Sequence, residues 1–224
     1  MRKRIGIVAL AFLFALTSAY AQTKDFFELV KAGTPQDVQA AIQEGASVNA
    51  RMSGVPQEQG KTPLSYAAQY NVDPKVITVL LKAGAGVNDL DTLWETPLML
   101  AAKFNQNPEV LIILLKAGAD IKAKTASKET ALMKAAGNNR NPEVITTLLK
   151  AGADINAKGA ALGWTPLDFA AKGNQNPEVL LTLLKAGADA KAKDNLEQTA
   201  LDYAKDNYAL KDTDALKQLE EASR

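Results

Sequence analysis

Residues 96–120 read TPLMLAAKFNQNPEVLIILLKAGAD, and most of the chain is built from variants of this stretch. An entry motif, Thr-Pro-Leu or Thr-Ala-Leu, recurs at intervals of 34, 34, 35 and 34 residues, beginning at Thr62, Thr96, Thr130, Thr165 and Thr199. Four copies continue with a pair of alanines, whereas the last has Ala204-Lys205. A fixed period of this length is typical of repeat proteins, in which each unit is one small helical or hairpin structure.

Two further landmarks keep the same period. One is Asn or Asp followed by Pro, beginning at residues 73, 107, 141 and 176, and the other is Leu-Leu-Lys-Ala-Gly-Ala, beginning at residues 80, 114, 148 and 183. Thr, Asn and Asp cap helix starts, Pro suits the first helical position, and Gly ends helices in the left-handed conformation. Each unit is therefore predicted to hold two short helices, the second ending at Gly84, Gly118, Gly152 or Gly187.

Isolated helices shorter than about 12–15 residues are marginally stable in water, so these units must stack on one another. The predicted fold class is an all-α repeat solenoid with one continuous core. We expect a single domain over residues 22–224. It has an N-terminal capping unit at 22–57, a C-terminal capping unit at 195–224, and internal repeats at 58–91, 92–125, 126–160 and 161–194.

The first 21 residues resemble a signal peptide. Basic residues at positions 2–4 precede an apolar run over residues 5–16, and Ala19 and Ala21 form an A-x-A cleavage pattern. The alternative, a membrane anchor, is disfavoured because a spanning helix needs about 20 apolar residues. We expect cleavage after Ala21, a periplasmic or secreted protein, and no membrane association after cleavage.

The composition excludes many kinds of site. The chain has no Cys and no His, so it lacks disulfides, thiolate nucleophiles and the commonest metal ligands and general bases. Its 26 Lys and Arg are interspersed with 25 Asp and Glu, which argues against a nucleic-acid partner. No Gly-rich phosphate loop is present. We predict no cofactor and no metal.

The carboxylates could suggest an enzyme, but each recurs at a fixed position of the repeat. Equivalent positions in stacked units form a row instead of converging on one point. The glutamates also suit the positive ends of the second helices. We therefore predict no enzymatic activity from Glu109, Glu143, Glu178, Asp120, Asp154 and Asp189.

These motifs resemble the ankyrin-repeat family. The resemblance is carried by Thr-Pro-Leu-x-x-Ala-Ala and by Leu-Leu-x-Ala-Gly-Ala-Asp, as at residues 114–120 and 183–189, and it covers nearly all of residues 24–224. It implies antiparallel helix pairs with short β-hairpin fingers, stacked into a curved slab. It also implies protein binding through the fingers and the first helices.

The chain departs from the family pattern between and within its repeats. Asn-x-Asn-Pro adds one residue between the helices, which resembles an exported bacterial subgroup. The fingertip glycine remains at Gly60 and Gly163. The other three tips have Trp94, Lys128 and Glu197, and we expect another turn there. The family's histidine after Thr-Pro-Leu is replaced by Ser65, Met99, Met133, Asp168 and Asp202.

The first finger, residues 49–62, is longer than the others. Its extra stretch, Arg51 to Gly60, is either a specificity element or a tolerated surface insertion.

The resemblance places the variable contact positions just before each entry Thr and just after each alanine pair. The predicted partner-binding residues are Glu58, Gln59, Lys61, Gln69, Tyr70, Thr92, Leu93, Trp94, Glu95, Lys103, Phe104, Ser127, Glu129, Asn138, Leu162, Trp164 and Lys172. Aromatic residues dominate many interface hot spots, which draws attention to Tyr70, Trp94, Phe104 and Trp164. The alternative is that each aromatic fills a gap between repeats. If Trp94 and Trp164 are contacts, alanine there weakens binding and leaves thermal stability nearly unchanged.

The sequence thus predicts an exported module, monomeric alone, that binds another folded protein through its concave face and fingers. A narrower alternative is an inhibitor or immunity factor for a toxin or hydrolytic enzyme in the envelope, with acidic Glu58, Glu95 and Glu129 facing a basic target. A third, an enzyme or small-molecule binder, would need a deep polar pocket.

Overall fold

The computed structural model describes residues 25–224, so the predicted signal peptide lies outside the described residues. Residues 25–32 are helical. The later helices are α2 (Pro35–Gln43), η1 (Pro56–Glu58), α3 (Pro63–Tyr70), α4 (Pro74–Lys82), α5 (Pro97–Phe104), α6 (Pro108–Lys116), α7 (Ala131–Asn138), α8 (Pro142–Lys150), α9 (Pro166–Gly173), α10 (Pro177–Lys185), α11 (Ala200–Ala204) and α12 (Asp214–Ala222).

The helices begin where the sequence predicts, and side-chain caps explain why. The first helices α3, α5, α7 and α9 are each preceded by a threonine whose hydroxyl accepts a bond from the third helical N–H, as Thr62 does from Ser65 at 3.2 Å. Ser65 returns the bond by accepting the N–H of Thr62 at 2.9 Å. Ser65 occupies the position that the family fills with histidine, so here that position closes a capping box.

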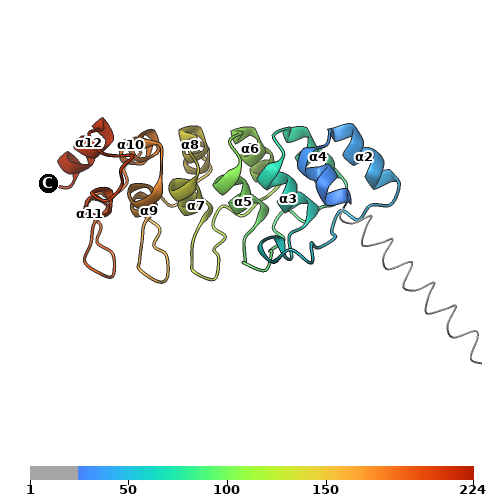
Figure 1. The fold of residues 1–224 in the computed structure, drawn as a ribbon, viewed down its shortest axis with the longest axis horizontal. Coiled ribbons are helices and arrows are strands. Elements are labelled where there is room, and N and C mark those ends of the chain that lie inside the picture. The colour runs from blue at the N-terminus through green and yellow to red at the C-terminus, as the bar shows by residue number, and fades with distance from the viewer. Residues whose placement is uncertain (1–24) are drawn as a thin grey trace, which may run out of the picture.

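The helices lie in two parallel rows. The first helices α3, α5, α7, α9 and α11 pack side by side, and α2, α4, α6, α8, α10 and α12 form the second row. Figure 1 shows the two rows one above the other, with loops extending from the side of the first helices. We call these loops the fingers: finger 1 is residues 51–61, finger 2 is 90–95, finger 3 is 124–129, finger 4 is 158–164 and finger 5 is 193–198.

The paired alanines lie at the centre of the first row. All eight are fully buried, at residues 67, 68, 101, 102, 135, 136, 170 and 171. Their small side chains allow neighbouring first helices to approach closely, and larger core residues come from both rows, such as Leu98 of α5 and Leu111 of α6. The solenoid core predicted from the period is confirmed.

A ladder of buried asparagines links each repeat to the one before it. Asn139 is fully buried, and its Nδ2 donates to the carbonyls of Ala102 and Asn105, both at 2.9 Å. Its Oδ1 accepts the N–H of Asn141 at 2.9 Å. The same pattern recurs at Asn71, Asn105, Asn174 and Asn207. The first Asn of Asn-x-Asn-Pro therefore joins the repeats.

The fingers are not β-hairpins, which corrects the expectation from the family. No strand occurs in residues 25–224. In finger 2 one backbone bond joins the Asp91 N–H to the Glu95 carbonyl at 3.1 Å, and the Asp91 carboxylate accepts the N–H groups of Leu93 and Glu95. A second backbone bond runs from the Trp94 N–H to the Asp91 carbonyl at 3.2 Å, and the loop that these bonds close is too short for a strand ladder.

The three fingertips without glycine share one turn. The N–H groups of Trp94, Lys128 and Glu197 bond to the carbonyl three residues earlier, at 3.2, 2.8 and 3.2 Å, whereas the Gly60 N–H bonds to the Met52 carbonyl at 2.9 Å. Trp94, Lys128 and Glu197 have φ of 61°, 57° and 61°, the same left-handed region as Gly60 at 79° and Gly163 at 72°. A non-glycine residue in this region costs about 1 kcal/mol or more. The three tips thus share the left-handed φ of the glycine tips and store backbone strain.

Because of this strain, we expect replacement by glycine to change the free energy of unfolding in opposite directions at two lysines of finger 3. Lys128→Gly relieves the left-handed strain, and we expect it to raise the free energy of unfolding by up to about 1 kcal/mol. Lys124, exposed and without positive φ, is the matched control, and Lys124→Gly should lower stability by about 0.5–1 kcal/mol. Urea unfolding of both variants measures this, and equal losses would contradict the strained turn.

Candidate functional site

Two positions on the finger side change chemistry from repeat to repeat. The residue before the entry Thr is Lys61, Glu95, Glu129, Trp164 or Gln198. The residue four positions after that Thr is Tyr66, Leu100, Lys134, Phe169 or Tyr203. Side chains from these positions take part in the three clusters described next.

The first cluster is an ion-pair network across repeats. The ammonium of Lys134 lies 2.9 Å from Glu95 Oε1 and 2.5 Å from Glu129 Oε2. Burial acts to lower the pKa of Lys134, but the carboxylates of Glu129 and Glu95 outweigh it, so the pKa is raised. Two carboxylates share one ammonium, which leaves the network with one net negative charge.

The second cluster fixes finger 1 to α3. The ammonium of Lys61 contacts Glu58 Oε2 and donates to Gln69 Oε1, both at 2.5 Å. The Tyr70 hydroxyl donates to Glu58 Oε1 at 2.7 Å. Burial, followed by this bond to a carboxylate, raises the pKa of Tyr70. The long finger is therefore anchored at its base by side chains of its own repeat.

The third cluster is aromatic and joins the last two repeats. The indole N–H of Trp164 reaches Asp194 Oδ2 at 3.1 Å and the Tyr203 hydroxyl oxygen at 2.9 Å. The Trp164 ring lies edge-on to Phe169 and Tyr203, with ring centroids 5.4 and 4.9 Å apart. The Tyr203 hydroxyl in turn donates to Asp194. Trp164 thus fills a gap between repeats, the alternative considered for it above.

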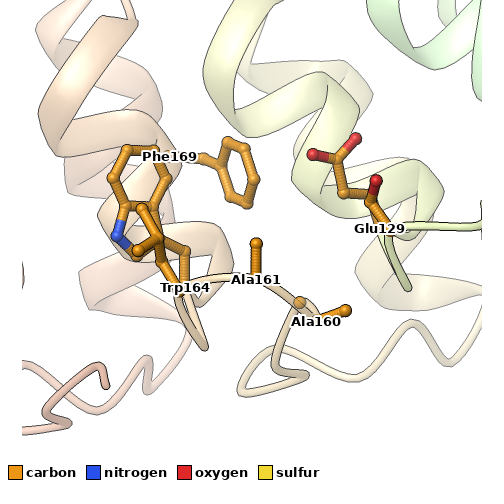
Figure 2. Close-up of a pocket in the computed structure, with 8 residues that line it drawn as sticks. Glu129, Ala160, Ala161, Trp164 and Phe169 are labelled. Carbon is orange, nitrogen blue, oxygen red and sulfur yellow. The ribbon is translucent and has the colours of Figure 1, made fainter. Parts of the chain in front are cut away.

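A pocket of about 190 Å³ lies between fingers 3 and 4. Figure 2 shows Trp164 and Phe169 on one side, Glu129 opposite them, and Ala160 and Ala161 along the lower edge. The lining is completed by Ser127, Gly159 and Leu162. Finger 4 has one residue more than finger 3, because the entry threonines on either side are 35 residues apart.

One carboxylate beneath this surface is buried with an unsatisfied oxygen. Asp168 is 1% exposed, and its Oδ2 accepts the Thr165 N–H at 2.7 Å and the Thr165 hydroxyl at 2.8 Å. Its Oδ1 has no hydrogen-bond partner in the described chain. Burial raises the pKa of Asp168, and the bonds from Thr165 only partly oppose this.

The raised pKa predicts how stability varies with pH. The folded state holds the Asp168 proton more tightly than the unfolded chain, so this group makes stability fall as pH rises from the ordinary carboxyl pKa through the raised one. Asp168→Asn removes the titration. Thermal unfolding of both proteins between acid and neutral pH should show the wild type losing stability relative to the variant as pH rises. A constant difference would contradict the raised pKa.

The exposed large apolar side chains are confined to the fingers and to the loops and ends beside the first helices. Within the described residues none of them lies on α4, α6, α8 or α10. They are Val55, Tyr70, Val72, Leu90, Leu93, Trp94, Phe104, Leu162, Leu196 and Tyr208. Trp94 is 57% exposed and Leu93 is 60% exposed, both at the tip of finger 2.

The predicted partner-binding residues differ in how exposed their side chains are. Three are buried and support the surface from below: Lys61, Gln69 and Glu95. Four are half-buried: Glu58, Lys103, Glu129 and Trp164. The remaining ten are exposed: Gln59, Tyr70, Thr92, Leu93, Trp94, Phe104, Ser127, Asn138, Leu162 and Lys172.

Sequence reasoning did not select Lys134, Phe169, Tyr203 and Asp194, which organise two of the clusters. Three of them occupy the position four residues after the entry Thr. That position changes chemistry from repeat to repeat while the adjacent alanine pairs stay constant. This contrast is the signal that could have identified them.

Over residues 25–224 no group of three or more Asp or Glu side chains is arranged to hold a metal ion. Among the described helices none has both the length and the apolar character needed to cross a membrane. The pocket is small, and its walls are mainly apolar.

Comparison with known proteins identifies the family. The family model described as ankyrin repeats (3 copies) matches residues 26–125, 98–194 and 132–219. No curated protein matches the chain. The matched ranges span almost all of the described stack, and ankyrin repeats are general protein–protein interaction modules that are typically not enzymes. With two rows of paired helices and one core throughout, this chain belongs to the ankyrin-repeat family.

Proposed function

We propose that this protein is an exported module that binds another folded protein with its fingers and first helices. The observation that carries the proposal is the one-sided distribution of exposed apolar side chains, from Tyr70 through Trp94 and Phe104 to Leu162. Clustered apolar exposure on one side of a soluble protein marks interaction surfaces. The stacked helices hold this surface in place before binding, so little conformational entropy is lost on docking.

The export part of the proposal rests on residues 1–21, with their basic start, apolar run and A-x-A pattern, and on the Asn-x-Asn-Pro motif of an exported bacterial subgroup. Expression of the full chain in its source cell should yield a mature protein that begins at Gln22, as measured by intact mass. A cytoplasmic protein that retains residues 1–21 would contradict export.

The narrower role of an inhibitor depended on acidic finger residues meeting a basic target. Glu58 is paired with Lys61, and Glu95 is paired with Lys134. Two of the three negative charges are therefore compensated within the protein, because Glu129 has to share Lys134 with Glu95. General protein binding is the role that we propose.

Capture with matched variants tests the binding surface. Residues 22–224 are immobilised and exposed to an extract of the native envelope. We expect the triple variant Leu93→Ser, Trp94→Ser, Phe104→Ser to lose the partner, since it removes exposed apolar contacts. The control is Glu109→Ser, Lys116→Ser, Lys150→Ser, exposed positions on α6 and α8. Both variants must first be shown to unfold like wild type. The proposed surface would be overturned if the first variant still captured the partner and the control variant did not.

A further inference from the structure

The pocket between fingers 3 and 4 has the size of a single side chain. Its volume is about 190 Å³, whereas small-molecule sites typically measure about 300–1,000 Å³. It lies on the side of the molecule where the exposed apolar side chains gather, and Leu162 belongs to both features. Its walls should therefore indicate which side chain of a protein partner would enter.

The walls combine aromatic rings with one carboxylate. Trp164 and Phe169 line one side, and their mutual edge-on packing, together with the indole bonds to Asp194 and Tyr203, fixes the Trp164 ring. Glu129 stands across the pocket from these rings, and its carboxylate points toward the space between them (Figure 2). A side chain in this space would touch rings on one side and a carboxylate on the other.

The charge of the site selects a cationic occupant. Glu95 and Glu129 share the single ammonium of Lys134, so the network keeps one negative charge. Of the two carboxylates, Glu129 is the more exposed, at 25% of its side chain against 6% for Glu95. A purely apolar occupant would cover the Glu129 carboxylate and displace its hydrating water without offering a hydrogen bond in return. Such desolvation of a charged group is unfavourable.

We propose that this pocket accepts an arginine side chain from the protein partner. A guanidinium group stacks on aromatic rings and binds carboxylates through its planar fork, while its aliphatic stem packs against apolar walls. The pocket offers a surface for each of these contacts. The aromatic rings can stack on the guanidinium, the Glu129 carboxylate can bind it, and the methyl groups of Ala160 and Ala161 can pack against the stem. The inference rests on the proposed function, because it names the chemistry that the binding surface recognises.

Nearby lysines do not remove this preference. Lys158, on finger 4, has its ammonium hydrogen-bonded to the Lys193 carbonyl of finger 5 at 2.9 Å. Lys124 and Lys128 are exposed on finger 3, where water and salt screen their charge. Glu129 is half-buried beside the pocket, so its attraction for a docked cation is screened less.

The test needs no partner, because amino-acid amides serve as probes. N-acetyl-arginine methylamide is titrated into residues 22–224 and compared with its neutral citrulline and norleucine counterparts. The protein has two tryptophans, so NMR gives two indole N–H signals, and Trp94 on finger 2 is an internal control outside the pocket. We expect arginine to shift the Trp164 signal saturably, and citrulline and norleucine to bind about tenfold more weakly, as the loss of a charged hydrogen bond implies.

The matched variants are Glu129→Gln and Glu109→Gln, the second on an exposed glutamate of α6. The first should weaken arginine binding about tenfold and the second should leave it unchanged. Raising the salt concentration should also weaken the arginine titration of the wild type. Equal binding of arginine and citrulline, equal effects of the two variants, or no saturable shift at Trp164 would each overturn the arginine pocket.

This titration and the capture experiment fail independently. Arginine binding with no captured partner would leave the pocket standing and count against the proposed function. Capture that depends on Trp94 and Phe104, with no arginine binding, would support the function and overturn the pocket.

Discussion

Asn139→Ala is expected to lower the free energy of unfolding by about 3 kcal/mol or more, a large share of the stability of a typical domain. The side chain is fully buried between repeats and makes three bonds to backbone groups, those of Ala102, Asn105 and Asn141. Alanine cannot replace these bonds, and each buried polar group left without a partner costs about 1–3 kcal/mol.

The adjacent asparagine is the matched control. Asn138 is exposed, and its side chain bonds only to the Lys134 carbonyl of its own helix at 3.0 Å. Asn138→Ala should change stability by less than about 0.5 kcal/mol. Urea unfolding followed by circular dichroism measures both variants. Similar small effects at the two positions would show that the asparagine ladder contributes little to joining the repeats.

The second large effect is expected at Trp164. Trp164→Ala removes the ring contacts with Phe169 and Tyr203 and both bonds of the indole N–H, so we expect a loss of about 2–3 kcal/mol. This replaces the expectation from sequence that alanine at Trp164 leaves thermal stability nearly unchanged. Partner binding should weaken as well, because the pocket loses its aromatic wall.

Trp94 provides the comparison for Trp164. It is 57% exposed at the tip of finger 2, so Trp94→Ala should stay within about 0.5 kcal/mol of wild type while partner binding weakens. Position 94 has a left-handed backbone, which is about equally strained for tryptophan and for alanine, so the substitution there leaves the strain unchanged. Calorimetric melting of the two variants separates them. A Trp164 variant as stable as the Trp94 variant would contradict the inter-repeat role of the indole.

The sequence predicted the parts of the fold that each repeat determines by itself. Threonine caps, proline at the first helical position and glycine after the second helix act over a few residues, so the period of the motifs carries them directly. The structure has the threonine caps, as at Thr62, and the left-handed glycines, as at Gly84 with a φ of 90°.

The sequence did not predict features that depend on residues about 34 positions apart. Lys134 joins Glu95 of the previous repeat, and Trp164 bonds to Asp194 of finger 5 and to Tyr203 of α11. Each partner is brought near only by stacking. The burial of Lys61, Gln69 and Glu95 likewise could not be predicted. The resemblance to the family gives the position of each residue within its repeat, but not the side chains that pack over it.

The left-handed φ of three fingertips was also not predicted from the sequence. Trp94, Lys128 and Glu197 are poor residues for this region, so local preference gave no sign of it. Backbone bonds between fingers hold the tips in place, including the Thr92 and Asn195 N–H bonds to the carbonyls of Gln59 and Leu162. Tertiary contacts therefore outweigh a local cost of about 1 kcal/mol.

The binding side of the solenoid is tested most directly by hydrogen–deuterium exchange of residues 22–224 with and without the captured partner. We expect the partner to slow exchange in the fingers and the first helices, above all at residues 90–95 and 158–164, and to leave α4, α6, α8 and α10 unchanged. Slower exchange confined to those four second helices would contradict the proposed binding surface.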